Sequence, residues 1–396
     1  MTPITPIATA PVPPLLPSIR RAKRMCPAAI APMVVASLLI TACYPADPPP
    51  LTAPAVSMST TLAAFRGDGY QHGPVGSATR DVVRDNALPV SLPDGYTMQV
   101  YSDTTSMPGA SAFYFQTNSA SLSPPGDPSA TLEAAPEGHP VALLPWNADE
   151  LAVAESGAGY VGVWPTGGAW IPPSVAGGNR VLLTYQRVRV NPWVTPATFS
   201  VIGQGVAEYA YPGAAAAIAN GIGATRLADD LFPNDNALVM GSPVFHKGWV
   251  YLYGCTLGTT CYGARAIPTN VTSAATWQWF DGTNYAGTKA QRRPLAGVGE
   301  FSPPNVVWVP ALNAYAMTSS RLDNKLAIRW ATSAVGPWTA AQVVTIPGCT
   351  VTSAGGGCFG GVVRPESAAN SLVLSYASYG TFRTRLATLG VTATPR

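Results

Sequence analysis

The chain has 396 residues with a net charge of +3, and only 11% of them are charged, whereas 38 are glycine and 40 are proline. This composition favours many short strands joined by turns and argues against a protein built from long amphipathic helices. The length allows one large all-β domain or two domains of average size.

The N-terminal segment has the layout of an export signal. Four basic residues between positions 20 and 24 precede eighteen uncharged residues, 25–42. The segment ends in Leu-Ile-Thr-Ala-Cys, which resembles the bacterial lipoprotein motif whose Cys becomes the lipidated first residue. We therefore predict a lipoprotein signal peptide at 1–42, lipidation at Cys43 and a location on the extracytoplasmic face of the membrane. The alternatives are a plain signal peptide and a single membrane anchor.

Removing this segment changes the charge of the protein. Residues 1–42 hold four of the 23 basic residues and none of the 20 acidic ones, so the remainder carries a net charge of −1. Without an excess of positive charge, nucleic-acid binding is not expected. Residues 43–74, rich in Pro, Ala, Ser and Thr, are expected to form a flexible tether, followed by the folded domain at 75–396.

The start of that domain predicts a β-hairpin. Residues 88–92 and 96–101 are strand-like, and Pro93-Asp94-Gly95 supplies a three-residue turn with Gly in the left-handed position. If residue 94 is the centre, Asp85 and Asp103 lie directly opposite each other on one face. Their Cβ atoms would then be about 4.5–5.5 Å apart.

Two carboxylates at that distance indicate a particular chemistry. They repel each other, so one pKa is expected to rise while the other stays low. Glycosidases use such a pair, with one carboxyl as acid and the other as base or nucleophile. The alternatives are an ion pair between Asp85 and the adjacent Arg84, and a turn cap formed by Asp103 with Thr104.

One pattern occurs five times along the chain. A turn of Gly, Asn or Asp precedes six to eight alternating residues at 95–103, 179–187, 248–255, 313–320 and 370–378. The spacing is too irregular for a strict repeat, but it leaves room for one four-stranded antiparallel blade per copy. We therefore predict an all-β fold, a five-bladed β-propeller, with a β-sandwich as the alternative. In a propeller the innermost strands converge on one axis, so a site there takes residues from several blades.

Four further cysteines form two close pairs, Cys255 with Cys261 and Cys349 with Cys358. In an oxidising compartment each pair is expected to form a disulfide. A zinc site that uses all four thiolates is the alternative, although the pairs lack CxxC spacing.

One motif is expected to be a coincidence. Residues 157–162 spell GxGxxG, but a dinucleotide site needs a helix to begin there within a βαβ unit, and a strand and turn are expected instead. We predict no cofactor. The three histidines lie far apart in the sequence, so no metal site is predicted either.

Several motifs in the correct order resemble domain-of-unknown-function family 4185. They are the Arg-Asp before the hairpin and the Ser-Asp-Thr after it, Asn118-Ser119, Gly241-Ser242-Pro243-Val244, a Gly-Pro-Trp turn at 336–338, and Arg364-Pro365-Glu366. The resemblance covers roughly residues 75–390. It departs from the family at Ser102, where Gly is expected, and at Arg364, where His is expected.

The resemblance implies a five-bladed propeller and, through glycoside hydrolase family 183, endo-acting cleavage of D-arabinan. That polymer occurs in the arabinogalactan and lipoarabinomannan of mycobacteria and their relatives. The candidate catalytic residues are Asp85, Asp103 and, from the last blade, Glu366. The candidate sugar-binding residues are Arg84, Asn118, Trp164, Ser242 and Asn305. We expect a monomer with a polysaccharide substrate; the alternative is a non-catalytic surface lipoprotein that binds a wall glycan or a protein.

Overall fold

The structure is a computed structural model that describes residues 55–56, 82–106, 114–133, 140–194, 197–232, 238–256, 260–295, 298, 304–320, 324–346, 349, 357–378 and 383–392. The predicted signal peptide, Cys43 and most of the predicted tether lie outside these residues. Residues Asp47–Arg396 form one compact unit. No helix in the described part of the chain is long and apolar enough to span a membrane.

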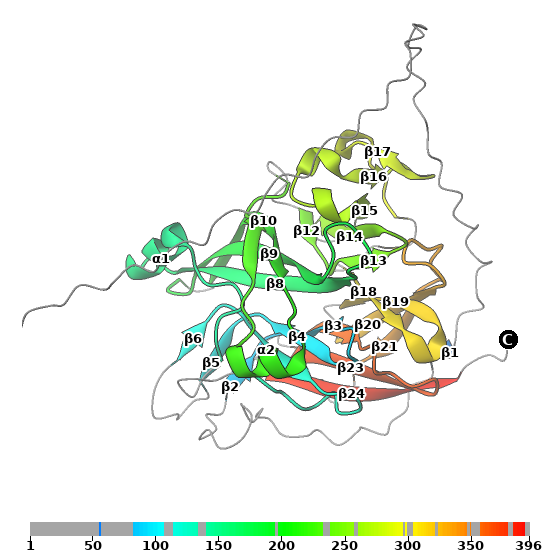
Figure 1. Cartoon of the computed structure of the whole chain (residues 1–396), viewed down its shortest axis with the longest axis horizontal. Helices are drawn as coiled ribbons and strands as arrows, with labels where there is room; N and C mark the ends of the chain where they lie inside the picture. The colour runs from blue at the N-terminus through cyan, green and yellow to red at the C-terminus, as the bar shows by residue number, and fades with distance from the viewer. Residues whose placement is uncertain are drawn as a thin grey trace, which may run out of the picture. The chain divides into compact units, whose positions relative to one another are not determined.

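Five antiparallel sheets follow one another along the chain (Figure 1). The first contains, in order, β3 (Leu88–Ser91), β4 (Thr97–Tyr101) and β7 (Ser119–Ser123). The second contains β8 (Tyr160–Ile171), β9 (Arg180–Asn191), β10 (Thr198–Tyr209) and β11 (Thr225–Ala228). The third contains β12 (Leu238–Met240), β13 (Val244–His246), β14 (Trp249–Thr256), β15 (Thr260–Ala266), β16 (Gln278–Phe280) and β17 (Tyr285–Gly287).

The fourth sheet contains β18 (Asn305–Val309), β19 (Ala314–Ser320), β20 (Lys325–Ala331) and β21 (Gln342–Thr345). The fifth contains β22 (Cys358–Val363), β23 (Ser371–Ser378), β24 (Arg383–Thr392) and β1 (Ala55–Val56). A small sheet of β2 (Val82–Arg84), β5 (Thr104–Ser106) and β6 (Phe115–Gln116) continues the hairpin of the first sheet. The helices are α1 (Ala148–Glu155), α2 (Ala214–Asn220), and 3₁₀ turns at Pro268–Asn270, Ala274–Thr276, Lys289–Gln291 and Pro310–Leu312.

The five copies of the sequence pattern form equivalent strands. They are β4, β9, β14, β19 and β23, and each is the second strand in the order of its sheet. A second strand has a neighbour on each side within its sheet and a packed sheet on each face, so its residues are mostly buried; all seven residues of β19 are buried. The five-bladed propeller predicted from the sequence is therefore confirmed, with one sheet as each blade.

Hydrophobic clusters join successive blades. One packs the first blade on the second, another the second on the third, and two more join the third to the fourth and the fourth to the fifth. Hydrogen bonds also join the fifth blade to the first: Ser375 Oγ donates to Ala87 O over 2.7 Å, and Thr384 Oγ1 donates to Arg84 O over 3.0 Å. At the outer edge of the fifth blade, β1 pairs with β24, so a segment from the N-terminal side supplies the fourth strand.

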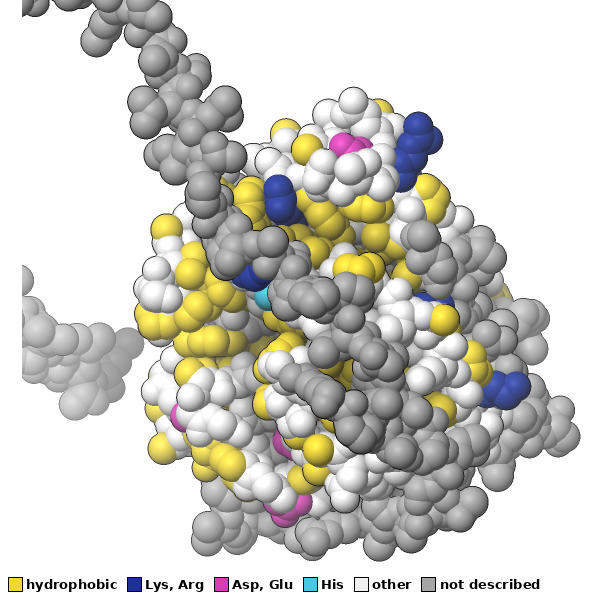
Figure 2. All heavy atoms as spheres, turned by 90° about the vertical axis from the view of Figure 1, so that its right-hand side faces the viewer, with side chains coloured by type: hydrophobic (Ala, Val, Ile, Leu, Met, Phe, Trp, Pro, Cys, Tyr) yellow, Lys and Arg dark blue, Asp and Glu magenta, His cyan; other side chains and the backbone are white. Residues whose placement is uncertain are grey.

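The surface reflects the low charge content. On the face seen in Figure 2, hydrophobic and uncharged polar side chains cover most of the coloured area, and charged side chains are isolated. Both predicted disulfides are confirmed. Cys255 and Cys261 occupy directly paired positions of β14 and β15, whereas the second bridge joins Cys349 to the start of β22.

Candidate active site

The structure confirms the predicted register of the first hairpin. Leu88 pairs with Val100 and Arg84 pairs with Thr104, so Asp85 lies opposite Asp103. The Asp85 backbone N–H donates to Asp103 O over 2.9 Å. Asp85 lies between β2 and β3, and β3 is the innermost strand of the first blade, on the side of the propeller axis.

The second blade supplies the hydrogen-bond donors of this pair. Trp164 Nε1 donates to Asp103 Oδ1 over 2.7 Å, and the Tyr160 hydroxyl donates to Asp103 Oδ2 over 3.1 Å. Both donors belong to β8, the innermost strand of the second blade. Asp85 differs, because its buried Oδ1 has no hydrogen-bond partner within the described part of the chain.

This difference in hydrogen bonding gives the two carboxyl groups different pKa values. Burial raises the pKa of Asp85 well above its ordinary value, and the negative charge of Asp103 adds to that rise. Burial also raises the pKa of Asp103, whereas the hydrogen bonds from Trp164 and Tyr160 lower it because they stabilise the charged form. The net result of these effects is a pKa of about 6. Both side chains stay half-buried and so keep some contact with solvent. The geometry favours a neutral Asp85 beside a charged Asp103 near neutral pH.

A glycine makes room for the indole ring that reaches Asp103. Gly162 lies between Tyr160 and Trp164, on the same face of β8. A Cβ atom on Gly162 would lie 2.6 Å from Trp164 Cε2 and 2.7 Å from Nε1, closer than any unstrained contact. The indole therefore lies over the backbone of Gly162, in the space that any other residue would fill.

The free edge of β8 is anchored beside these donors. Since β8 is the last strand of its sheet, carbonyl groups on that edge need partners from elsewhere. Asn118 Nδ2 donates to Val163 O over 2.9 Å, and Trp146 Nε1 donates to Val161 O over 2.7 Å. Asn118 also accepts from the Leu144 backbone N–H over 2.6 Å. These bonds hold the stretch of β8 that carries Tyr160 and Trp164.

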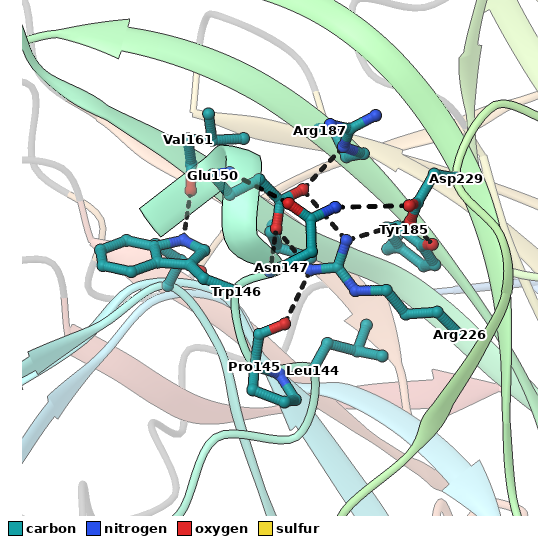
Figure 3. Close-up of polar contacts among 12 residues, drawn as sticks. Leu144, Pro145, Trp146, Asn147, Glu150, Val161, Tyr185, Arg187, Arg226 and Asp229 are labelled. Carbon is teal, nitrogen blue, oxygen red and sulfur yellow. Dashed lines mark hydrogen bonds and ion pairs between the residues drawn. The ribbon is translucent and has the colours of Figure 1, made fainter. Parts of the chain in front are cut away.

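Helix α1, which leads into β8, is fixed by an ion-pair network (Figure 3). Glu150 is buried and accepts from Arg187 Nε over 2.7 Å and from Arg226 Nη2 over 2.6 Å. Its carboxylate also caps the helix by accepting from the Asn147 backbone N–H. Arg226 in turn donates to Asp229 over 3.0 Å. The network ties α1 to β9 and β11 and so positions the start of β8.

The predicted sugar-binding residues have different surroundings. Arg84 is fully buried, donates to both oxygens of Glu133 over 2.5 and 2.7 Å, and lies 4.5 Å from the centre of the Tyr101 ring. Asn118 is also buried and bonded to backbone, as described above. The geometry gives these two residues structural roles, and Arg84 pairs with Glu133 rather than with Asp85.

Ser242 lies between β12 and β13, and Asn305 is the first residue of β18, the innermost strand of the fourth blade. Ser242 is 5% exposed and packs against Gly167, whose Cβ would lie 2.2 Å from Ser242 Oγ. Asn305 begins β18, and its buried Oδ1 has no hydrogen-bond partner in the described residues. Their predicted contact with sugar stays a prediction.

The structure does not bring Glu366 to the aspartate pair. Its carboxylate is held by Arg364, at 2.7 Å from Nη2 and 3.1 Å from Nε, and it also bonds the side chain of Thr97. Thr97 is the first residue of β4, at the end of that strand away from Asp103. Burial raises the pKa of Glu366, but Arg364 outweighs this effect and the pKa lies below its ordinary value.

Tyr160 and Gly162 were not predicted from the sequence. Both lie in the 157–162 motif, within which β8 begins at Tyr160; the strand expected there is present, and no helix begins at this motif. The available signal was a small residue between two aromatic residues with hydrogen-bonding groups, at the start of an innermost strand. That signal has meaning only once the adjacent blade is known to carry a carboxylate.

Comparison with known proteins finds fold similarity only. No protein-family model matches the chain, and no curated protein sequence matches it. Among solved structures, a candidate hydrolase from Bacteroides ovatus has a TM-score of 0.53 at 14% identity, covering 78% of this chain and 85% of the other. At that identity the likeness concerns the fold alone.

Two further structures are similar at lower scores. The catalytic domain of a GH62 α-L-arabinofuranosidase from Coprinopsis cinerea has a TM-score of 0.43 at 13% identity, over 82% of this chain and 98% of the other. A levansucrase from Gluconacetobacter diazotrophicus has a TM-score of 0.49 at 12% identity, over 87% of this chain and 86% of the other.

Proposed function

We propose that the protein is a glycoside hydrolase in which Asp85 is the general acid and Asp103 is the base or nucleophile. The observation that supports this assignment is the unequal bonding of two opposed carboxyl groups. Asp103 accepts two hydrogen bonds, which favour its charged form, whereas the buried oxygen of Asp85 has none among the described residues. A glycosidase needs this pairing of a proton donor with a carboxylate.

The chemistry follows from these protonation states. Asp85 transfers its proton to the glycosidic oxygen as the bond between that oxygen and the anomeric carbon breaks. In the same step Asp103 either removes a proton from the water that attacks the anomeric carbon, or itself bonds to that carbon as a glycosyl ester. In the second case the deprotonated Asp85 takes a proton from the water that hydrolyses this ester, which frees Asp103 and returns Asp85 to its acid form. Tyr160 and Trp164 orient the Asp103 carboxylate for either step, because each donates to a different oxygen.

We propose D-arabinan as the substrate, cleaved within the polymer. The resemblance of the sequence to family 4185, and through it to glycoside hydrolase family 183, supports this choice. The lipoprotein motif ending at Cys43 supports a lipid-anchored protein on the extracytoplasmic face, where such a wall polymer is accessible. Replacement of Cys43 by Ala should then release the protein from the membrane fraction, and continued membrane attachment would contradict the anchor.

Incubation with mycobacterial arabinogalactan tests the activity. Wild type should release oligosaccharides, whereas Asp85→Asn and Asp103→Asn should each lower the rate by at least about a hundredfold. Asp149→Asn is the matched control, because Asp149 is an exposed carboxylate at the start of α1. Equal release by wild type and Asp85→Asn would remove Asp85 from the mechanism. Binding without release by wild type would favour a glycan-binding lipoprotein.

A further inference from the structure

Large exposed hydrophobic side chains gather at one place in the described residues. Four of the seven lie between positions 193 and 202, at the end of the β9–β10 hairpin, with exposed fractions of 75% for Trp193, 41% for Val194, 61% for Phe199 and 39% for Ile202. The other three, Leu151, Ile267 and Val343, lie far apart in the sequence, on α1, after β15 and on β21. Single exposed hydrophobic residues are ordinary, but a group of four at one hairpin end marks a binding surface.

The two strands of this hairpin, together with β8, are the longest strands in the described part of the chain. β8, β9 and β10 have twelve residues each, whereas the innermost strands of the other blades have three to six. Their common end is the end at which β8 begins, because Tyr160 pairs with Val190 and Val190 pairs with Phe199. The exposed group therefore lies at the same end of the second blade as the donors of Asp103.

The exposed group is also continuous with the carboxylate pair. Tyr160, Val190 and Phe199 are in register across three strands, so their side chains share a face of the sheet. The ring centres of Phe199 and Trp164 are 6.3 Å apart, and the same indole of Trp164 donates to Asp103. A sugar ring on Phe199 would be one aromatic side chain away from the reacting carboxylates.

We propose that Phe199 and Trp193 form a stacking platform that binds sugar rings of a neutral polysaccharide beside the cleavage site. This inference rests on the proposed function. The C–H faces of sugar rings are apolar and stack on aromatic faces, while their hydroxyl groups need small polar partners. Residues 190–207 contain hydroxyl and amide side chains but no charged one, which suits a neutral glycan better than an anionic polymer.

Affinity for the polymer and cleavage of a short substrate separate the platform from the catalytic pair. Phe199→Ala and Trp193→Ala should each weaken binding of the purified protein to soluble arabinogalactan about threefold to tenfold, measured by affinity electrophoresis. The kcat for a short arabino-oligosaccharide should fall by a smaller factor than the polymer affinity, because the rings bind sugar and do not contact the bond that is cleaved. Val343→Ala is the matched control, since Val343 is 45% exposed on the fourth blade. Asp85→Asn should bind the polymer like wild type.

Three results would contradict the proposed platform. Two of them are an unchanged polymer affinity in both variants and an equal loss of affinity in the Val343→Ala control. The third is a wild-type dimer that Phe199→Ala converts to a monomer, because the hairpin end would then be a self-association surface. The proposed function can fail separately. If wild type binds the polymer through Phe199 but releases no product, the platform stands and the hydrolase assignment fails.

Discussion

Replacement of Trp164 by Phe tests the electrostatic basis of the site with one change. The variant keeps an aromatic ring but loses the Nε1–H group that donates to Asp103 Oδ1 over 2.7 Å. A hydrogen bond to a charged group contributes about 1.5–3 kcal/mol, and about 1.36 kcal/mol corresponds to a change of one in a pKa. Because Trp164 is half-buried, we take the lower end of the range and expect the pKa of Asp103 to rise from about 6 to about 7.

The direction of the pKa change depends on which protonation state of Asp103 the hydrogen bond stabilises. Loss of a donor to the carboxylate disfavours the charged form, so the acidic limb of the kcat/KM profile moves to higher pH. At pH 6 the rate should fall about fivefold, while well above pH 7 this limb no longer lowers it. A ¹³C NMR titration of the Asp103 carboxyl group measures the same change without substrate. Trp170→Phe, on the same strand, is the control, and an unmoved Asp103 titration in folded Trp164→Phe would refute the reasoning.

Three other changes address the surroundings of the pair. Gly162→Ala should cost about 1–3 kcal/mol of unfolding free energy and raise the pKa of Asp103, because the new methyl group displaces the indole; thermal unfolding and the same titration would show both. Glu366→Gln should destabilise the protein by about 3 kcal/mol in denaturant but leave the rate per folded molecule unchanged, since it removes the ion-pair partner of the buried Arg364; a lost rate at intact stability would contradict this. Asp85→Asn should stabilise the protein at pH 7 and not at pH 3. The pKa of Asp85 is raised by folding, so the contribution of Asp85 to wild-type stability declines as pH rises above about 4, and an identical pH profile of thermal unfolding in both proteins would count against it.

Local patterns in the sequence predicted the strands well because they report local physics. The five alternating runs became the second strands of five blades, where burial on both faces demands apolar residues. The turn at 93–95 fixed the register of the first hairpin, and that register placed Asp85 opposite Asp103. Each of these predictions needs only neighbours along the chain or across one hairpin.

Contacts between blades could not be predicted in the same way. A closed propeller places the last blade beside the first, and the bonds from Ser375 and Thr384 show this contact. The sequence did not indicate the position of Glu366 along the blade boundary, and the carboxylate contacts Thr97 at the far end of β4 from Asp103. Arg84 likewise pairs with Glu133, 49 residues away and on no predicted element.

The asymmetry of the aspartate pair arises at the boundary between two blades. A hairpin alone places two carboxyl groups in equivalent positions, and their repulsion does not decide which one keeps its proton. β8 of the next blade decides it, because both of its donors reach Asp103. Those donors depend on the glycine beneath the indole and on the bonds from Asn118 and Trp146 that hold the edge of β8. The proposed acid and base roles therefore depend on packing between blades, and a change on β8 should alter the protonation of Asp103 without touching the hairpin that carries it.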